Sequence, residues 1–143
     1  MKDTFIPSKS SLQKEWYIID ATNKCLGRLA TEIVYILRGK NKIFYNPAQD
    51  LEQIIIVINS SKVSVTGKKS FQKVYFRHSG RPGGDTLETF KNLQKRLPER
   101  ILEKAVKGML PKNKLGRRLF KNLKVYKGKD HPHISQQPKF INI

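Results

Sequence analysis

Cysteine, acidic side chains and long apolar runs are all scarce in this chain of 143 residues. Its one cysteine, Cys25, excludes a disulfide framework and a zinc site built on cysteines. The longest apolar runs, Ile33 to Leu37 and Ile54 to Ile58, are five residues each, whereas a helix needs about 20 to span a bilayer. Residues 1–15 contain no apolar stretch typical of a secretory signal. These absences predict a soluble, intracellular protein.

Positive charge is what the sequence has in excess. Lys and Arg number 29 against 11 Asp and Glu, which gives a formal net charge of +18. Such a charge favours a polyanionic partner, which could be RNA, DNA or an anionic membrane surface. Most of the excess lies in residues 61–143, where apolar residues also recur at structural spacing. We therefore interpret the second part of the chain as a folded binding surface rather than a disordered tail.

The order of elements along the first part predicts an α/β fold. Trp16 to Ile19 and Ile54 to Ile58 are rich in aromatic and β-branched residues, as buried strands are. Between them, apolar residues at helical spacing from Leu29 to Leu37 predict a helix that ends before Gly39. A strand, a helix and a strand in this order predict a right-handed βαβ unit with parallel strands.

We expect a single domain, because domains typically contain roughly 100–200 residues. We divide the chain into an N-terminal arm at 1–14, an α/β body at 15–127 and an extended tail at 128–143. Pro82-Gly83-Gly84 predicts a loop over 77–84. The other expected elements are strands at 63–66, 74–76 and 123–126, and helices at 86–96, 98–109 and 114–122.

Residues that could carry catalysis or hold a metal ion are few and scattered. The histidines His78, His131 and His133 lack the partners of a nucleophile motif, and His131 and His133 lack a third ligand. Asp20 ends a strand, where α/β proteins keep functional groups, but we favour a role in capping the following turn. Gly27 belongs to no dinucleotide-binding or Walker pattern. We therefore predict no metal ion and no cofactor.

Basic clusters interleaved with glycine are the strongest functional signal. One follows a predicted helix end at Arg38 to Lys42, and another follows the turn at Gly67. Segment 77–84 combines arginines and a histidine with glycines that let the backbone approach a phosphate, and segment 107–118 places cations between two helices. The residues predicted to contact nucleic acid are Arg38, Lys40, Lys42, Lys68, Lys69, Lys73, Arg77, His78, Arg81, Lys107, Lys112, Lys114, Arg117, Arg118, Lys121, Lys124 and Lys127.

Aromatic residues accompany these cations at Tyr75, Phe76, Phe120 and Tyr126. Each could stack on a nucleobase, although aromatic residues at such positions more often belong to the core. No recognition-helix motif for DNA is visible, and loops rich in Gly and Arg suit irregular RNA shapes. RNA is therefore the favoured partner.

A set of motifs spread along the chain matches a known family. They are Trp16 to Ala21, Leu26 to Ala30, Arg38 to Lys40, Val65 to Gly67, His78 to Gly80, Lys107 to Pro111, Gly116-Arg117, Leu123 to Tyr126 and Gln136 to Pro138. Together they closely resemble the bacterial type of the large-subunit ribosomal protein thirteen family. The match is collinear from about residue 12 to the end, and the Gly108-Met109-Leu110-Pro111 segment is highly specific to that family.

The resemblance implies a three-layer α/β/α domain with a mostly parallel four-stranded sheet, basic loops and a C-terminal extension. It also implies that the chain binds large-subunit ribosomal RNA beside neighbouring ribosomal proteins and acts early in subunit assembly. By the same resemblance the chain is not an enzyme and has no membrane or small-molecule partner. One stretch departs from the family pattern, since Ala48, Leu51, Glu52 and Gln53 stand where a His and a Gly-Asp pair are usual.

The likeness is greatest to cyanobacterial and plastid members, in segments 77–84 and 127–133. The chain contains 21 Lys and 8 Arg, a preference typical of AT-rich genomes. We therefore expect a plastid ribosome in the chloroplast stroma, with the bacterial cytoplasm as the alternative. Two other functions stay open: a free regulatory RNA-binding protein, and a metal-dependent RNA-processing enzyme that uses Asp20.

Overall fold

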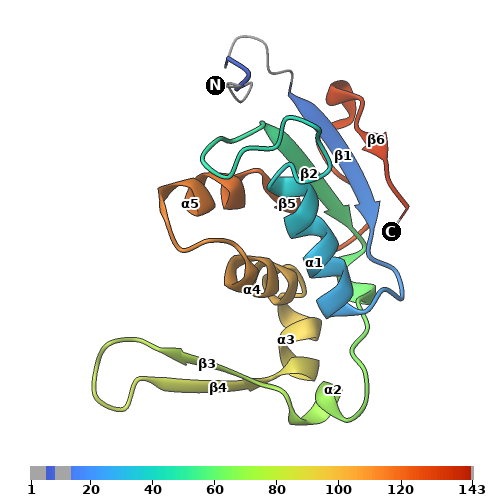
Figure 1. The fold of residues 1–143 in the computed structure, drawn as a ribbon. Coiled ribbons are helices and arrows are strands. Elements are labelled where there is room, and N and C mark those ends of the chain that lie inside the picture. The colour runs from blue at the N-terminus through green and yellow to red at the C-terminus, as the bar shows by residue number, and fades with distance from the viewer. Residues whose placement is uncertain (1–5, 9–13, 143) are drawn as a thin grey trace.

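The computed structural model describes residues 6–8 and 14–142, and its strands form two separate sheets (Figure 1). The larger sheet has the strand order β5-β2-β1-β6, and all of its neighbouring strands are parallel. Its strands are β1 (Glu15–Asp20), β2 (Gln53–Ile58), β5 (Leu123–Val125) and β6 (Lys139–Phe140). The predicted α/β class with a mostly parallel four-stranded sheet is confirmed.

Helices and a hairpin complete the described part of the chain. The helices are α1 (Leu26–Leu37), α2 (Lys69–Gln72), α3 (Phe90–Arg96), α4 (Glu99–Met109) and α5 (Lys114–Lys121), with single 3-10 turns at η2 (Ser60–Lys62) and η3 (Ile134–Gln136). The hairpin strands are β3 (Val74–His78) and β4 (Asp85–Thr89). The expectation for residues 1–14 falls mostly on positions outside the described residues.

The main core lies between the large sheet and the helices α1 and α4. Ile19 of β1 and Ile55 of β2 are fully buried and belong to one cluster with Ile33 of α1 and Leu102 of α4. The register of the parallel pair places Ile19 beside Val57, so alternate residues of both strands point into this cluster. Burial of each such side chain stabilises the fold by about 1.5–3 kcal/mol. This cluster makes the body a rigid support.

The C-terminal segment closes one edge of the large sheet. Strand β6 pairs with β1, and the residues before it contact aromatic side chains of the body. The His133 ring lies 5.2 Å from the Trp16 ring, and its Nε2 lies 2.8 Å from the Tyr126 hydroxyl oxygen. The His131 ring lies 6.5 Å from the Tyr126 ring. These two histidines therefore help to hold the C-terminal segment on the body.

The smaller sheet is an antiparallel hairpin that projects from the body beside α2 and α3 (Figure 1). The strand predicted at 74–76 is present and extends to His78. The helix predicted at 86–96 is wrong in its first part, because residues 85–89 pair with β3 and place Leu87 opposite Phe76. Helix α3 begins only at Phe90, where the Thr89 hydroxyl accepts a hydrogen bond from the backbone N–H of Asn92.

The strand predicted at 63–66 is also wrong. Within it, only Ser64 forms a bridge, and its partner is Cys25 at the start of α1. The Leu26 N–H donates to the Ser64 carbonyl at 2.9 Å, and the Ser64 N–H donates to the Lys24 carbonyl at 3.0 Å. The segment that contains Cys25 continues directly into helix α1, so the bridge cannot extend into a pair of strands.

Segment 48–53, which departs from the family pattern, supports the end of α1. Gly39 follows α1 with a φ of +71°, as predicted for a glycine that ends a helix. The buried Leu51 side chain packs directly against Gly39 and occupies the space that a Cβ there would need. Gln53 is also buried, and its Nε2 donates to Asn41 Oδ1 at 3.2 Å. This segment therefore has a packing role.

Candidate nucleic-acid interface

The most specific family motif forms the turn between α4 and α5. The Asn113 side chain caps α5 by accepting a hydrogen bond from the Gly116 N–H at 2.8 Å. Gly116 is buried so close to the Pro111 carbonyl that a Cβ would collide with it. This close approach of the two backbones fixes the turn, and it explains why residue 116 is a glycine.

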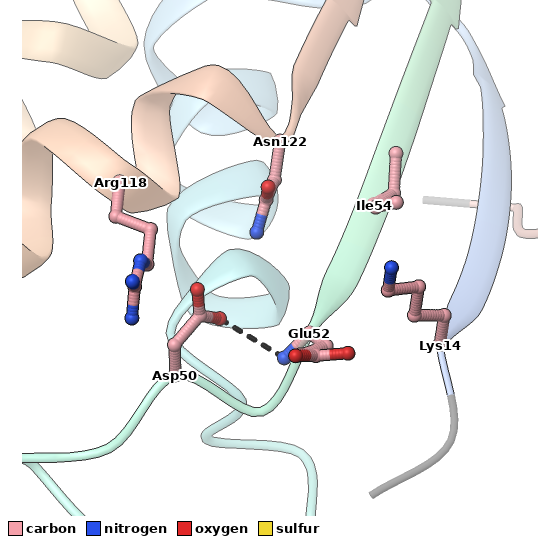
Figure 2. A pocket seen from close by; sticks show the side chains of 6 residues that line it. All are labelled: Lys14, Asp50, Glu52, Ile54, Arg118 and Asn122. Carbon is pink, nitrogen blue, oxygen red and sulfur yellow. Dashed lines mark hydrogen bonds between the residues drawn. The ribbon is translucent and has the colours of Figure 1, made fainter. Parts of the chain in front are cut away.

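A pocket of about 310 Å³ lies beside the start of β2 (Figure 2). Two carboxylates, Asp50 and Glu52, and two cations, Lys14 and Arg118, line it. The charges of these side chains balance, so the pocket offers little net attraction to a polyanion. The structure thus separates Arg118 from Arg117, which faces a different pocket between α4 and α5.

That second pocket has a volume of about 440 Å³ and carries only positive charge among the side chains that line it. Its cations are Lys107, Lys112, Arg117 and Lys121, all of them exposed. Helix α5 places Arg117 and Lys121 on one face because residues four apart lie on the same side of a helix. Four of the predicted site residues are therefore brought together here.

The hairpin carries Arg77 within β3 and His78 and Arg81 at its tip, and all three are exposed. Gly80 and Gly83 adopt φ values of +89° and +73°, which glycine reaches without strain. The His78 Nδ1 accepts a hydrogen bond from the Gly80 N–H at 2.8 Å, and this contact orders the turn. The His78 Nε2 lies 3.4 Å from an Asp85 carboxylate oxygen, so both ring nitrogens have partners, and Arg81 is the potential phosphate ligand that the tip presents.

Three cations at the root of the hairpin are not among the contact residues predicted from the sequence. Arg96, Arg100 and Lys104 line a small cavity under β3 and β4, together with Arg77 and Tyr75. Arg100 and Lys104 lie four residues apart in α4, and that spacing is a signal that could have revealed these two, whereas Arg96 ends the preceding helix α3. The hairpin adds Arg77 to this line, so the cluster is formed only in the folded chain.

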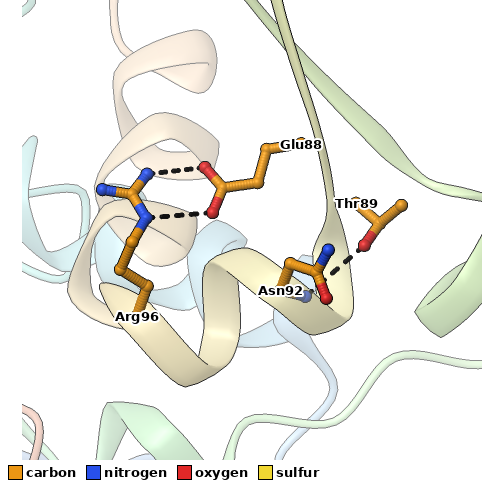
Figure 3. Close-up of polar contacts among 4 residues, drawn as sticks. All are labelled: Glu88, Thr89, Asn92 and Arg96. Atoms are coloured by element: carbon orange, nitrogen blue, oxygen red, sulfur yellow. Dashed lines mark hydrogen bonds and ion pairs between the residues drawn. The ribbon is translucent and has the colours of Figure 1, made fainter.

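A single carboxylate, Glu88, orders this root cluster. It accepts two hydrogen bonds from the Arg96 guanidinium, at 3.0 and 2.6 Å (Figure 3). The Arg96 hydrogen bond lowers the pKa of Glu88, and the same bond raises the pKa of Arg96. The bidentate contact therefore holds the Arg96 guanidinium in one orientation beside the hairpin.

Tyr75 lies between two lysines at the same place. The Nζ atoms of Lys73 and Lys104 lie 5.5 and 5.0 Å from the centroid of its ring. Burial raises the pKa of the Tyr75 hydroxyl. Tyr75 therefore packs against the core, as its sequence position favours, while it also positions two cations.

The cluster after α1 is partly engaged inside the molecule. Arg38 Nη2 donates to the Tyr45 hydroxyl at 2.9 Å, and Lys42 Nζ forms an ion pair with Glu15 at 2.6 Å. The Glu15 hydrogen bond raises the pKa of Lys42. Lys40 is exposed and has no such partner among the described residues.

Of the remaining predicted cations in the described part of the chain, only Lys73 touches one of these groups, through its contact with the Tyr75 ring. Lys68, Lys69 and Lys73 are exposed around α2, and Lys114 is exposed at the start of α5. Lys127 is exposed while its carbonyl accepts a hydrogen bond from the Ser61 hydroxyl at 3.1 Å. Lys124 is half-buried in β5.

Asp20 caps the turn after β1, as we favoured. Its Oδ1 accepts hydrogen bonds from the Thr22 N–H, the Thr22 hydroxyl and the Asn59 side chain, at 2.9, 2.6 and 3.0 Å. The Thr22 hydrogen bond in particular lowers the pKa of Asp20. Across residues 6–8 and 14–142, no three His, Cys, Asp or Glu side chains gather where they could hold a metal ion. Within those ranges, no helix is both long and apolar enough to cross a membrane.

A parallel α/β body with cations on a projecting hairpin and on a helix–helix turn has the charge distribution of an RNA-binding protein. The family model described as Ribosomal protein L13 matches residues 14–132. Proteins named Large ribosomal subunit protein uL13 are 61% identical in Trichormus variabilis and 62% identical in Gloeothece citriformis. Each comparison covers 100% of this chain and 95% of the relative. The chain belongs to the ribosomal protein L13 family, in its bacterial type.

Proposed function

We propose that this chain is a structural constituent of the large ribosomal subunit, where it binds large-subunit ribosomal RNA and supports early subunit assembly and translation. The observation that carries the proposal is the identity of 61% over the whole chain with proteins named Large ribosomal subunit protein uL13. The net charge of +18 supports a polyanionic partner. In this role the chain acts by binding rather than by catalysis.

The proposed mechanism is neutralisation of phosphates from separate RNA helices by two cationic regions on one rigid support. The first region is the hairpin, which carries Arg81 at its tip and Arg77 beside the root cluster of Arg96, Arg100 and Lys104. The second is the turn between α4 and α5. Because the hairpin projects from the body in Figure 1, the two regions can reach different RNA segments. We propose the predicted cations as ligands, with Arg38, Lys42 and Arg118 the least available for RNA.

Neighbouring large-subunit proteins are the second class of partner that we propose. We place the ribosome in a plastid because the preference for Lys over Arg is typical of AT-rich genomes. A bacterial cytoplasm is the alternative, and the cyanobacterial source of the relatives named above favours it. Mapping the coding sequence to a plastid or a bacterial genome distinguishes the two locations.

The function is tested by quantitative co-sedimentation with ribosomal subunits after a high-salt wash. We expect close to one copy of the chain per large subunit, retained through the wash. A variant with Lys112→Ala, Lys114→Ala and Arg117→Ala should incorporate less well than a control with Arg28→Ala, Lys62→Ala and Lys95→Ala, which removes as many cations elsewhere. Recovery of the wild-type chain in the free fraction would contradict a structural role and favour the free regulatory protein.

A further inference from the structure

The pocket between α4 and α5 combines two surfaces that a phosphate alone would not need. Its apolar lining residues are Leu110, which is buried, and Pro111 and Phe120, which are half-buried, while its four cations are exposed. We refer to the apolar lining as the floor and to the exposed cations as the rim. Leu110 is 4% exposed, so the floor is continuous with the core. With a volume of about 440 Å³ the pocket falls in the range of about 300–1,000 Å³ that is typical of sites for small organic groups.

Phe120 has two environments. It packs against the main core, and it also lines the pocket. The Nζ of Lys107 lies 5.9 Å from the centroid of its ring, so the ring already attracts one cation of the rim. The close contact between Gly116 and the Pro111 carbonyl fixes the turn that also lines the pocket. The pocket is therefore built into the helix–helix turn and does not depend on the rotamer of one exposed side chain.

Charge decides what kind of group can occupy this pocket. Among the described residues, no carboxylate lines it, in contrast to the balanced pocket of Figure 2, where Asp50 and Glu52 face Lys14 and Arg118. An occupant must therefore bring negative charge to the rim and an apolar, flat body to the floor. A nucleotide of unpaired RNA has both parts, since its base is a π-surface and its flanking phosphates are anionic. Phosphates of an RNA duplex would satisfy the rim but leave the floor uncovered.

We propose that this pocket receives one unpaired nucleobase of the bound RNA, which stacks on the Phe120 ring while its flanking phosphates contact Lys112, Arg117 and Lys121. The proposal rests on the proposed function for its source of RNA. It assigns Phe120 a direct role in RNA contact besides its place beside the core. It also makes α4 and α5 a site that selects single-stranded RNA over duplex.

The test compares two RNA hexanucleotides that differ only by one abasic residue at a central position. Binding of the purified full-length chain is measured at a low and a high salt concentration. We expect the abasic probe to bind the wild-type chain roughly 5- to 150-fold more weakly, as is typical of the removal of one base–aromatic stack. This ratio should persist at high salt, because salt screens phosphate contacts far more than stacking.

Two substitutions at Phe120 separate stacking from folding. Phe120→Leu keeps an apolar side chain against the core but removes the ring, so the ratio between the two probes should fall to about one. Phe120→Tyr keeps the ring and should restore the ratio. Phe71→Leu is the matched control, because Phe71 is 67% exposed on α2 and lies outside the pocket. Thermal melting of each variant shows that it is folded.

Equal binding of the two probes to the wild-type chain would overturn the proposal, and so would an unchanged ratio in Phe120→Leu. A hexaglutamate peptide that displaces the intact probe and loses affinity in Phe120→Leu would instead assign the pocket to an acidic protein segment. These outcomes are distinct from failure of the proposed function, since they use short RNA and no ribosomes. Release of the chain from washed subunits would contradict the proposed function, yet the same chain could still bind the intact probe more tightly than the abasic probe.

Discussion

The large sheet and the hairpin use β-strands in opposite ways. In the body, Ile19 and Ile55 are fully buried, and their strands are placed by the core around them. In the hairpin, Phe76 and Leu87 face each other across the ladder yet are 60% and 70% exposed. Backbone hydrogen bonds and contacts at its root hold the hairpin, so its side chains are available to a partner. The difference separates side chains that stabilise the fold from side chains that are exposed to a partner.

We expect the largest effect, a change in the free energy of unfolding, when one leucine is truncated in each of the two regions. Leu102→Ala, in a fully buried position of α4, should lower the free energy of unfolding by about 2–5 kcal/mol. Leu87→Ala removes the same atoms from an exposed position and should change it by no more than about 0.5 kcal/mol. Urea denaturation followed by circular dichroism measures both. Similar losses in the two variants would show that the hairpin is part of the cooperative core.

The elements of the body could be predicted because local pattern and final environment agree there. Ile54 to Ile58 has the composition of a buried strand, and it is one. Residues 85–89 mislead because Leu87, Phe90 and Leu93 have helical spacing, whereas the pairing of residues 85–89 with β3 decides their conformation. That pairing is a contact between separate segments, so it cannot be predicted from the periodicity of either segment alone.

The candidate site could be predicted only where cations are grouped along the chain. Arg77 and Arg81 stand out beside their glycines. By contrast, Arg96 on one helix and Arg100 and Lys104 on the next look like ordinary solvated cations until the hairpin lies over them. Neighbours in sequence can also be separated. Consecutive residues of a helix point about 100° apart, so Arg117 and Arg118 line different pockets.

The second prediction concerns the binding role of the hairpin. Arg77→Ala with Arg81→Ala should weaken binding to ribosomal RNA and lower the slope of log K against log salt by up to roughly 0.7–0.9 for each phosphate that is no longer neutralised. Unfolding stability should stay unchanged, because both side chains are exposed. A filter-binding titration over several salt concentrations measures the slope.

The control for that experiment is Arg28→Ala with Lys95→Ala, which removes equal charge from exposed positions outside the predicted interface. It should lower the slope less than the hairpin variant does. Equal slopes in the two variants would mean that RNA binding depends on the total charge of the chain and would contradict a specific binding role for the hairpin.

The smallest expected effect compares one carboxylate from each region. The pKa of Asp20 is lowered mainly by its hydrogen bond from Thr22, and that of Glu88 mainly by its bond from Arg96. A carboxyl whose pKa is lower in the folded state stabilises the fold fully above its ordinary pKa. This stabilisation is lost as the pH falls from the ordinary value through the lowered one. Both carboxylates should therefore contribute to a loss of stability on acidification.

Salt should separate the two contributions. Urea midpoints measured from neutral pH down to about pH 3 should show a smaller acid-dependent loss in Asp20→Asn and in Glu88→Gln than in the wild-type chain. High salt should remove the difference for Glu88, because its partner is an exposed cation and that attraction is screened. The difference for Asp20 should persist, because its partners are the neutral groups of Thr22 and Asn59. If salt removed both differences, the turn at the end of β1 would depend on the charge of Lys62 rather than on its hydrogen bonds.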